Sequence, residues 1–264
     1  MITSLHSPHV MAVKALLGSR SSKERRNSGR YVIEGAQNVN SAIANAPESV
    51  EKIYFTSESR DRINSSSWNG ELIEVAPNVM KAMSDTVTPQ GIVAVAKIFD
   101  SDLSLSSLKS LKNPRIAYFW EIQDPGNAGT AIRAADAFGF DLVIFSENSV
   151  DAYSPKVIRS TAGSFWNLPV LEDITGEQIL NLSQRLNIRI FATFAEAELS
   201  LKDAAFSCRE EGSIWIFGNE ARGIPDSLVA TLEPIKVAIP MTGGAESLNL
   251  ATAASVVMYA VANT

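Results

Sequence analysis

The sequence predicts an α/β protein with two domains, the second of which holds a mainly parallel sheet. Along the chain, short apolar runs of strand length alternate with segments of helical length and periodicity. The alternation is interrupted at residues 99–113, where a polar stretch rich in Ser, Leu and Lys has the composition of a linker. These observations place one domain at residues 1–98 and another at residues 114–264, and a chain of 264 residues can bury a sizeable core.

The first domain is predicted to be a small α/β sandwich. Its expected strands are 31–33, 52–55, 72–75 and 92–96. Its expected helices lie near 10–17, from 36 to about 45, around Ser59 and after Pro77. Between the first helix and the first strand, basic residues alternate with Ser, Gly and Asn, which predicts a loop.

The second domain begins a new alternation, which predicts a parallel sheet with helices on both faces. Its expected strands lie near 116–121, 141–146, 188–193, 213–217 and 235–239. Its expected helices lie near 127–138, 155–162, 176–187, 226–231 and 247–261. Two helix starts have explicit signals, because Thr175 with Gln178 forms a capping box and Ser154 precedes a first-turn proline.

Composition narrows the class of protein. The single cysteine, Cys208, excludes an internal disulfide, and neither His6 nor His9 lies in a cluster of ligands, so we expect no metal site. The first residues lack the pattern of a signal peptide. The longest apolar stretch, 248–262, is shorter than the roughly 20 residues that cross a bilayer. We therefore expect a cytoplasmic protein with no membrane partner.

Charge is distributed unevenly. The net charge of −6 argues mildly against nucleic-acid binding, which needs basic residues for phosphates. Four basic residues, Lys23, Arg25, Arg26 and Arg30, are nevertheless concentrated in the expected loop. Such a run is most often solvated surface. The alternative is contact with nucleic-acid phosphates, which an acidic protein makes through a local basic patch.

Three predicted strands end in polar, glycine-bearing loops, which ordinary scaffolding rarely needs. The loops contain Asn127-x-Gly129-x-x-x-Arg133, Gly218-Asn219-Glu220-x-x-Gly223, and Ile239-Pro240-Met241 with Glu246-Ser247-Leu248-Asn249. Together they resemble, in order, the three motifs of the SpoU/TrmH family of S-adenosylmethionine-dependent RNA ribose 2′-O-methyltransferases, which belong to the SPOUT class. The segments 159–170 and 31–35 extend the resemblance to nearly the whole chain.

The resemblance implies a C-terminal SPOUT domain with a trefoil knot, an N-terminal domain that binds RNA, and a homodimer whose active sites draw on two subunits. The apolar residues on many sides of the helix at 247–261 also favour a homodimer. The implied cofactor is S-adenosylmethionine. The favoured substrate is 23S ribosomal RNA, because an N-terminal domain of this length resembles those of members that act on large-subunit ribosomal RNA.

The resemblance also assigns roles to individual residues. The implied catalytic residues are Asn127, Arg133, Glu220, Ser247 and Asn249. The implied cofactor-binding residues are Thr193, Gly218, Asn219, Gly223, Ile239, Met241 and Leu248. The implied RNA contacts are the four basic residues at 23, 25, 26 and 30.

Several of these residues also have plain structural interpretations. Asn127 and Ser247 are both good helix N-caps, and Glu220 is a good acceptor for a turn. Asn249, expected inside an apolar helix, is harder to explain structurally, because a buried amide needs partners. Arg133 points away from the apolar face of its predicted helix, so it is either a solvated arginine or, as in the family, a residue that faces the partner subunit's cofactor.

The chemistry of Arg133 is constrained by its charge. A guanidinium group stays protonated, which favours clamping a phosphate or stabilising a developing alkoxide. The group that accepts the proton of the 2′-hydroxyl stays open. The second motif departs from the family pattern at two positions. Ala221 and Arg222 stand where a glycine and often an acidic residue occur, and we expect Arg222 to alter the substrate side of the pocket.

Three other functions compete with this interpretation. Gly126-x-x-Gly129 and Glu147 weakly imitate a dinucleotide-binding unit of a nicotinamide-dependent dehydrogenase, but the third glycine is missing. A non-catalytic RNA-binding protein on the same fold is the second alternative. The third is a ribose 2′-O-methyltransferase that acts on tRNA.

Overall fold

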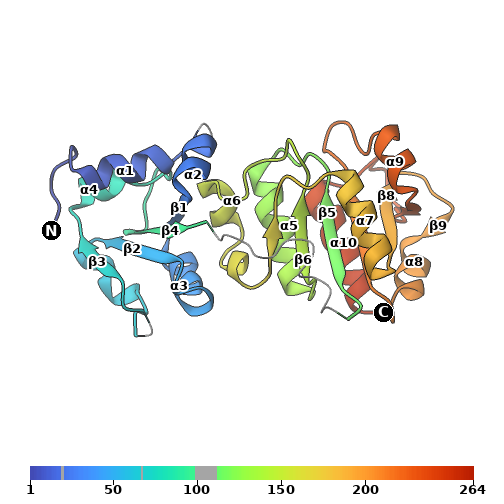
Figure 1. Ribbon diagram of the computed structural model, residues 1–264, viewed down its shortest axis with the longest axis horizontal. Coiled ribbons are helices and arrows are strands. Elements are labelled where there is room, and N and C mark those ends of the chain that lie inside the picture. The colour runs from blue at the N-terminus through green and yellow to red at the C-terminus, as the bar shows by residue number, and fades with distance from the viewer. Residues whose placement is uncertain (19–20, 67, 99–111) are drawn as a thin grey trace. The chain divides into compact units, whose positions relative to one another are not determined.

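The computed structural model describes residues 1–18, 21–66, 68–98 and 112–264 (Figure 1). The chain divides into two compact units: Met1–Asp100 with Asp151–Asn167, and Ser101–Val150 with Leu168–Thr264. Each unit has its own sheet. The predicted linker at 99–113 lies outside the described residues except for its last two, and the domain boundaries drawn from the sequence stay a prediction.

The first unit is an α/β domain around a four-stranded sheet. The strands are β1 (Arg30–Glu34), β2 (Val50–Phe55), β3 (Glu71–Glu74) and β4 (Ile92–Lys97). Their order is β1-β4-β2-β3, with β4 antiparallel to both neighbours and β2 parallel to β3. The helices before and between the strands are α1 (Pro8–Leu16), α2 (Ser22–Ser28), α3 (Ala36–Asn45) and α4 (Pro77–Ala82), with a 3-10 helix η2 (Ser57–Arg62).

Helices cover both faces of this sheet (Figure 1). Figure 1 shows α1 and α4 on one face and α3 on the other. Val10 and Val13 of α1 and Val79 of α4 form one core with Val32 and Val93 of the strands. Successive side chains of a strand point to opposite faces, and nearly all those of β1 and β4 are buried, so these two strands supply two apolar faces.

The basic stretch after α1 is a helix, where the sequence predicts a loop. The helix α2 ends at Gly29, whose φ of +62° suits a helix C-terminus. It lacks an apolar stripe, and its buried residue is Arg25, with 0% of its surface exposed. The Arg25 guanidinium donates to Asp151 at 2.8 Å through Nε and to the carbonyl oxygens of Leu16 and Gly18 at 2.7 and 3.0 Å.

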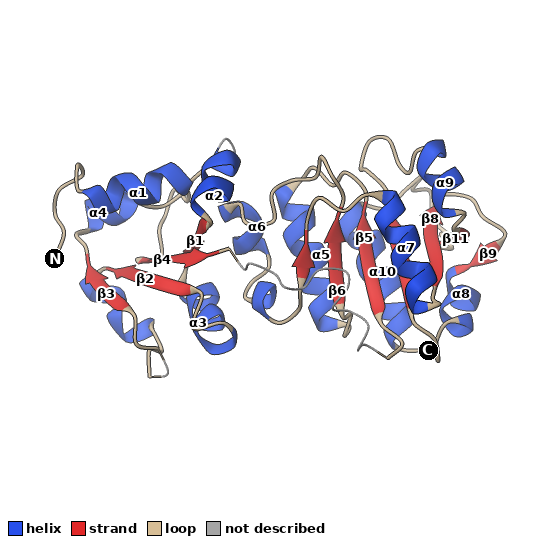
Figure 2. Ribbon diagram, in the orientation of Figure 1, coloured by secondary structure: helices blue, strands red, loops and turns tan. Residues whose placement is uncertain are grey.

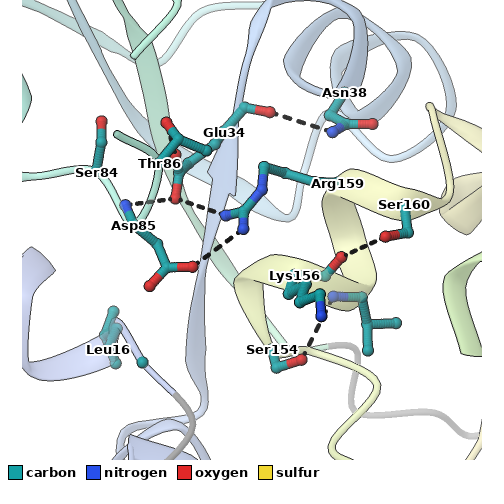
Figure 3. Close-up of polar contacts among 12 residues, drawn as sticks. Leu16, Glu34, Asn38, Ser84, Asp85, Thr86, Ser154, Lys156, Arg159 and Ser160 are labelled. Carbon is teal, nitrogen blue, oxygen red and sulfur yellow. Dashed lines mark hydrogen bonds and ion pairs between the residues drawn. The ribbon is translucent and has the colours of Figure 1, made fainter. Parts of the chain in front are cut away.

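Residues 151–167 belong to the first unit, although the sequence places their helix in the second domain. The segment contains α6 (Pro155–Ser160) and a 3-10 helix η4 (Ser164–Trp166). In Figure 3, Arg159 of α6 reaches Glu34 at the end of β1 and Asp85, at 3.1 and 3.0 Å. The Glu34 carboxylate, which is buried, also accepts the N–H of Asp85 at 2.9 Å. An arginine from this segment thus neutralises a buried acid of the first unit.

The same segment completes the apolar core of the first unit. The indole of Trp166 donates to the hydroxyl of Tyr31 at 3.0 Å, and the rings of Tyr31 and Tyr153 meet edge to face with centroids 5.0 Å apart. Burial raises the pKa of the Tyr31 hydroxyl far above its ordinary value. Residues more than a hundred positions away in the sequence therefore finish this core.

The second unit is built on a seven-stranded sheet in which every neighbouring pair is parallel, as predicted (Figure 2). Its strands are β5 (Arg115–Phe119), β6 (Leu142–Phe145), β7 (Val170–Leu171), β8 (Arg189–Phe194), β9 (Leu199–Ser200), β10 (Ser213–Phe217) and β11 (Ile235–Ala238). Its helices are α5 (Pro125–Ala137), α7 (Gly176–Leu186), α8 (Leu201–Ser207), α9 (Asp226–Leu232) and α10 (Leu250–Ala262). The strand order is β7-β6-β5-β10-β8-β11-β9.

Helices lie on both faces of this sheet. Ile179 of α7 and Leu228 of α9 pack with Ile116, Ile144 and Ile214 in one buried cluster. The helix α10 contacts α5 and α8. The predicted capping box is confirmed, because Thr175 and Gln178 bond each other's backbone N–H groups. The trefoil knot stays a prediction from the family resemblance.

The last helix begins later than the sequence predicts. It starts at Leu250, and Asn249 is its N-cap, so Ser247 caps no helix and Asn249 is not buried in a helix interior. In the described part of the chain, none of the helices is long and apolar enough to span a membrane.

Candidate functional site

The first polar loop precedes α5, whose N-cap is Asp124 and not Asn127. The Asp124 carboxylate accepts the N–H of Asn127 at 2.8 Å, and Pro125 occupies the first turn. The interpretation of Asn127 as a plain N-cap is therefore wrong. Its side chain, in the first turn of α5, bonds instead to the other two polar loops, as described below.

The second polar loop follows β10 and is closed by its own backbone. Asn219 and Gly223 exchange two backbone hydrogen bonds of 2.9 Å, and the Asn219 side chain accepts the N–H groups of Ala221 and Arg222 at 3.0 and 3.1 Å. Gly223 has a φ of +67°, which favours glycine. A Cβ on Gly218 would lie 2.5 Å from the carbonyl carbon of Gly223, so the turn cannot close around a larger residue.

Glu220 bonds the first loop rather than its own turn. One carboxylate oxygen accepts the N–H of Asp124 at 3.2 Å and the side-chain amide of Asn127 at 3.1 Å. The other accepts the N–H of Gln123 at 3.3 Å. These charge-assisted hydrogen bonds hold the Glu220 carboxylate of the second loop against the first loop. The turn-stabilising alternative for Glu220 is therefore incomplete, since the residue joins loops from two different strands.

The third polar loop joins the same network through Asn249. Its side-chain oxygen accepts the N–H groups of Ala251 and Thr252, at 2.9 and 3.3 Å, and caps α10. Its side-chain nitrogen donates to the side-chain oxygen of Asn127 at 3.1 Å. The three side chains Glu220, Asn127 and Asn249 thus form one chain of hydrogen bonds, which we call the motif network. Its bonds fix the orientation of both amides.

A cavity of about 450 Å³ lies beside the motif network, within the second unit. The end of β8, the second loop and the segment from β11 to α10 line it. All seven residues predicted to bind a cofactor lie on its wall, namely Thr193, Gly218, Asn219, Gly223, Ile239, Met241 and Leu248. Glu220, Ser247 and Asn249 line it as well. Of the predicted catalytic residues, Asn127 reaches this wall only through its bonds to Glu220 and Asn249.

Six lining residues had no role in the sequence analysis. They are Phe194, Ala195, Ile224, Glu246, Leu250 and Ala253. Most are apolar neighbours of predicted residues, and only their position in the fold reveals them. Glu246 lies inside a motif and adds a second carboxylate to the wall beside Glu220. The described lining contains no lysine or arginine, so its charged side chains are both acidic.

Arg133 lies apart from this cavity. It is exposed on α5, does not line the cavity, and makes no ion pair or hydrogen bond within the described ranges. The neighbouring positions Ala131, Ile132, Ala134 and Ala135 are buried. The helical periodicity therefore places Arg133 on the solvent side of α5 in a single chain, as the sequence predicts.

Comparison with known proteins identifies the family. Residues 114–259, more than half of the chain, match the sequence model of the SpoU rRNA Methylase family. The chain belongs to this family. Residues 8–94 match a second model, the MRM3-like substrate binding domain. The three motifs that carry the resemblance therefore lie in a family domain, and the basic residues lie in the matched region before it.

SpoU relatives cover almost the full chain. A 23S rRNA (guanosine(2553)-2′-O)-methyltransferase of Bacillus subtilis is 29% identical over 90% of both chains. An uncharacterized tRNA/rRNA methyltransferase of Synechocystis is 31% identical over 98% of this chain and 92% of its own. Among solved structures, the SpoU methyltransferase AviRb of Streptomyces viridochromogenes has a TM-score of 0.82 at 26% identity, over 97% of this chain and 96% of its own.

The four basic residues predicted to contact RNA differ in how exposed they are. Lys23 and Arg26 are exposed on α2. Arg25 is fully buried against Asp151, so the prediction that it contacts RNA is wrong. A buried arginine needs a partner, and this one already has three acceptors. Arg30 is bonded by both Nε and Nη2 to Glu51, at 2.6 and 3.0 Å, and this carboxylate raises the pKa of Arg30.

Proposed function

We propose that this chain transfers a methyl group from S-adenosylmethionine to a ribose 2′-hydroxyl of large-subunit ribosomal RNA. The observation that carries the proposal is the motif network at the wall of the cavity. It brings together one polar residue from each of three loops, across 93 and 122 positions of sequence. Packing alone does not require this convergence, because each of the three loops already has its own closure or cap.

The cavity suits S-adenosylmethionine in size and chemistry. Its volume of about 450 Å³ is within the range of small-molecule sites. Ile224, Ile239 and Leu248 supply apolar wall, and Glu220 and Glu246 supply negative charge for a ligand with cationic groups. When bound, the cofactor supplies a methyl group on a positively charged sulfur. The solved structure of AviRb with AdoMet has the same fold, with a TM-score of 0.85 at 24% identity.

The motif network prepares the protein side of the reaction. Asn127 and Asn249 each use one N–H of the side-chain amide within the network, which leaves a second N–H on each. These donors, held in fixed orientation, are suited to the oxygen atoms of a ribose. Ser247 adds a hydroxyl on the cavity wall. Fixed donors lower the reorganisation needed when charge develops on the reacting oxygen.

Arg133 acts in this proposal from a second copy of the chain. Its exposed position on α5, away from the cavity of its own chain, suits a role in the partner subunit's site. The neighbouring helix α10 leaves Val256 and Tyr259 37% and 58% exposed, and Tyr259 packs edge to face on Phe138. This apolar surface supports a homodimer. There Arg133 clamps a phosphate or stabilises the developing alkoxide, because its guanidinium group carries a positive charge.

The relatives and the first unit support the choice of large-subunit ribosomal RNA as substrate. The Bacillus subtilis relative is named for 23S rRNA, and so is a Streptomyces viridochromogenes relative that is 26% identical over 93% of this chain. The match of residues 8–94 to a substrate binding domain supports a role of the first unit in holding RNA. We place the protein in the cytoplasm, where ribosomal RNA is modified in bacteria.

The decisive experiment is methyl transfer in vitro. Purified chain is incubated with methyl-labelled S-adenosylmethionine and separately with 23S rRNA, 16S rRNA and tRNA, and digested nucleosides are analysed for 2′-O-methylation. We expect label in 23S rRNA, with loss of activity in Glu220→Gln and full activity in Glu211→Gln, which changes an exposed acid of the same unit. If label appears in tRNA alone, the substrate is tRNA and the proposal of 23S rRNA is wrong. Binding of RNA without transfer to any of them supports the non-catalytic alternative.

A further inference from the structure

We infer that Arg222 and Glu121 are positioning residues, which together clamp the first polar loop so that the motif network is held in register. The inference rests on the proposed function, because the network is the machinery that it positions. It also gives a role to Arg222, the position where the sequence departs from the family pattern. The guanidinium of Arg222 pairs with the carboxylate of Glu121, which lies just after β5.

Glu121 has a backbone conformation that needs external support. Its φ is +47°, a left-handed conformation that side chains other than glycine seldom adopt. Its N–H donates to the hydroxyl of Ser146 at 2.7 Å. Its carbonyl oxygen accepts the side-chain amides of Asn219 at 2.7 Å and Gln123 at 3.1 Å. Such a conformation persists where the surroundings determine it from several sides.

Arg222 adds the contact that holds the Glu121 side chain. Its own backbone N–H is fixed by Asn219, at 3.1 Å, so the second polar loop grips Glu121 through two residues. The Arg222 side chain is 70% exposed and that of Glu121 is 18% exposed. An ion pair as open as this contributes little to the free energy of unfolding. The ion pair therefore acts locally, on the backbone conformation at Glu121.

The path at Glu121 decides where the next amides lie. Gln123 and Asp124 present their N–H groups to the two oxygens of Glu220, and Asp124 begins α5. If the kink at Glu121 relaxes, these two donors leave the carboxylate, and Glu220 no longer holds Asn127 in one orientation. Small displacements of groups that orient a substrate reduce the rate strongly. The clamp thus acts on the reaction through Glu220.

Four variants test the clamp: Arg222→Ala, Glu121→Ala, both together, and Glu121→Gly. We expect Arg222→Ala and Glu121→Ala each to lower kcat about tenfold to hundredfold. We expect little change in the affinity for S-adenosylhomocysteine or in the melting temperature. The double variant should be no slower than either single one, because both remove the same clamp. Glu121→Gly should keep more of the rate than Glu121→Ala, because glycine adopts a positive φ without support.

Hydrogen exchange gives a readout that does not depend on activity. In Arg222→Ala the amides of residues 121–127 should exchange faster than in the wild type, while those of α7 stay unchanged. The matched control is Arg209→Ala, which opens an exposed ion pair with Glu210 in the same unit and should change neither exchange in 121–127 nor kcat. Unchanged exchange in Arg222→Ala, or faster exchange with an unchanged kcat, would overturn the inference. If the wild type transfers no methyl group, the proposed function fails, while the exchange data still decide whether the clamp holds the loop.

Discussion

Two groups of polar residues in this protein differ in their burial and contacts. Both groups consist of charged or amide side chains close to the ends of strands or helices. In the motif network, Glu220, Asn127 and Asn249 form a chain of hydrogen bonds across three loops, and Glu220 and Asn249 line a cavity. In the basic segment, Arg25 is buried and Arg30 is paired with Glu51, while Lys23 and Arg26 are exposed. The comparison teaches that residue type alone does not distinguish a side chain that is buried to maintain the fold from one that is placed at a cavity, and that the contacts in the folded chain do.

The largest expected effect is on Arg133, which belongs to neither group. In Arg133→Ala we expect kcat to fall by about 10²–10³-fold, because a donor aimed at the developing charge is lost. Affinity for S-adenosylhomocysteine should change little, since the residue does not line the cavity of its own chain. Mixing this variant with Asn249→Ala and measuring the regained activity tests the two-subunit site. No regain from mixed dimers would contradict the role of Arg133 in the partner subunit.

The comparison predicts that replacing Arg25 lowers the stability of the fold and does not directly change RNA binding. Arg25→Ala removes a fully buried guanidinium and leaves the carboxylate of Asp151, only 11% exposed, without its ionic partner, so the free energy of unfolding should fall by about 3 kcal/mol. Denaturant titration measures this loss. Under conditions where the variant is folded, the salt dependence of RNA binding should match that of the wild type. A changed salt slope would show that Arg25 contacts phosphates after all.

Asn249 combines both properties, since it caps a helix and belongs to the network. Asn249→Ala should lower the free energy of unfolding by about 1 kcal/mol, the usual effect of a lost N-cap. It should also reduce kcat, because Asn127 loses its donor. The matched control is Ser200→Ala, which removes the N-cap of α8 away from the network and should lower stability but not kcat. Equal activity in the two variants would remove Asn249 from the mechanism.

Lys23 and Arg26 are the exposed members of the basic segment. If both contact phosphates, Lys23→Ser with Arg26→Ser should reduce the slope of log affinity against log salt by about 0.7 to 0.9 per lost contact. The melting temperature should not change, because neither side chain is buried. A salt titration of binding to 23S rRNA fragments measures the slope. An unchanged slope would assign these side chains to solvated surface.

The smallest expected effect comes from the Arg30–Glu51 pair. Arg30 lowers the pKa of Glu51 below its ordinary value of 4.5 through a hydrogen bond and through its charge. The stabilisation is therefore present above pH 4.5 and is lost as the pH falls through the lower pKa of the folded protein. Because the pair is partly exposed, its contribution is less than about 1 kcal/mol. Glu51→Gln should remove this part of the acid dependence, as measured by melting temperatures between about pH 5 and pH 3.

The sequence predicted the elements that have an apolar period. The strands and helices that it predicted lie within a few residues of their expected places, because each buries a regular apolar face. It missed the seven-residue helix α8. It missed β7 and β9, which have two residues each and therefore no period. It missed α2 because that helix buries an arginine instead of an apolar stripe.

The sequence predicted which residues lie at the candidate site better than it predicted the hydrogen bonds that they make. The resemblance picked seven residues that do line one cavity. The prediction of Ser247 as the helix cap was wrong, because Asn249 also suits the position and is the cap in the structure. The bonds of Glu220 to the first loop depend on the register of β10 beside β5, which no local pattern reveals. Glu121 was missed because a positive φ at a glutamate has no signature in the sequence.

The membership of residues 151–167 in the first unit has a consequence for anyone who wishes to exchange the first unit of this protein for another. That part is discontinuous in the gene, and cutting at residue 113 separates Tyr31 from Trp166 and Glu34 from Arg159. A chimera joined at one point would expose an aromatic core on one fragment and leave an uncompensated buried acid on the other. A transplant that carries both 1–98 and 151–167 preserves these partners and needs three junctions instead of one.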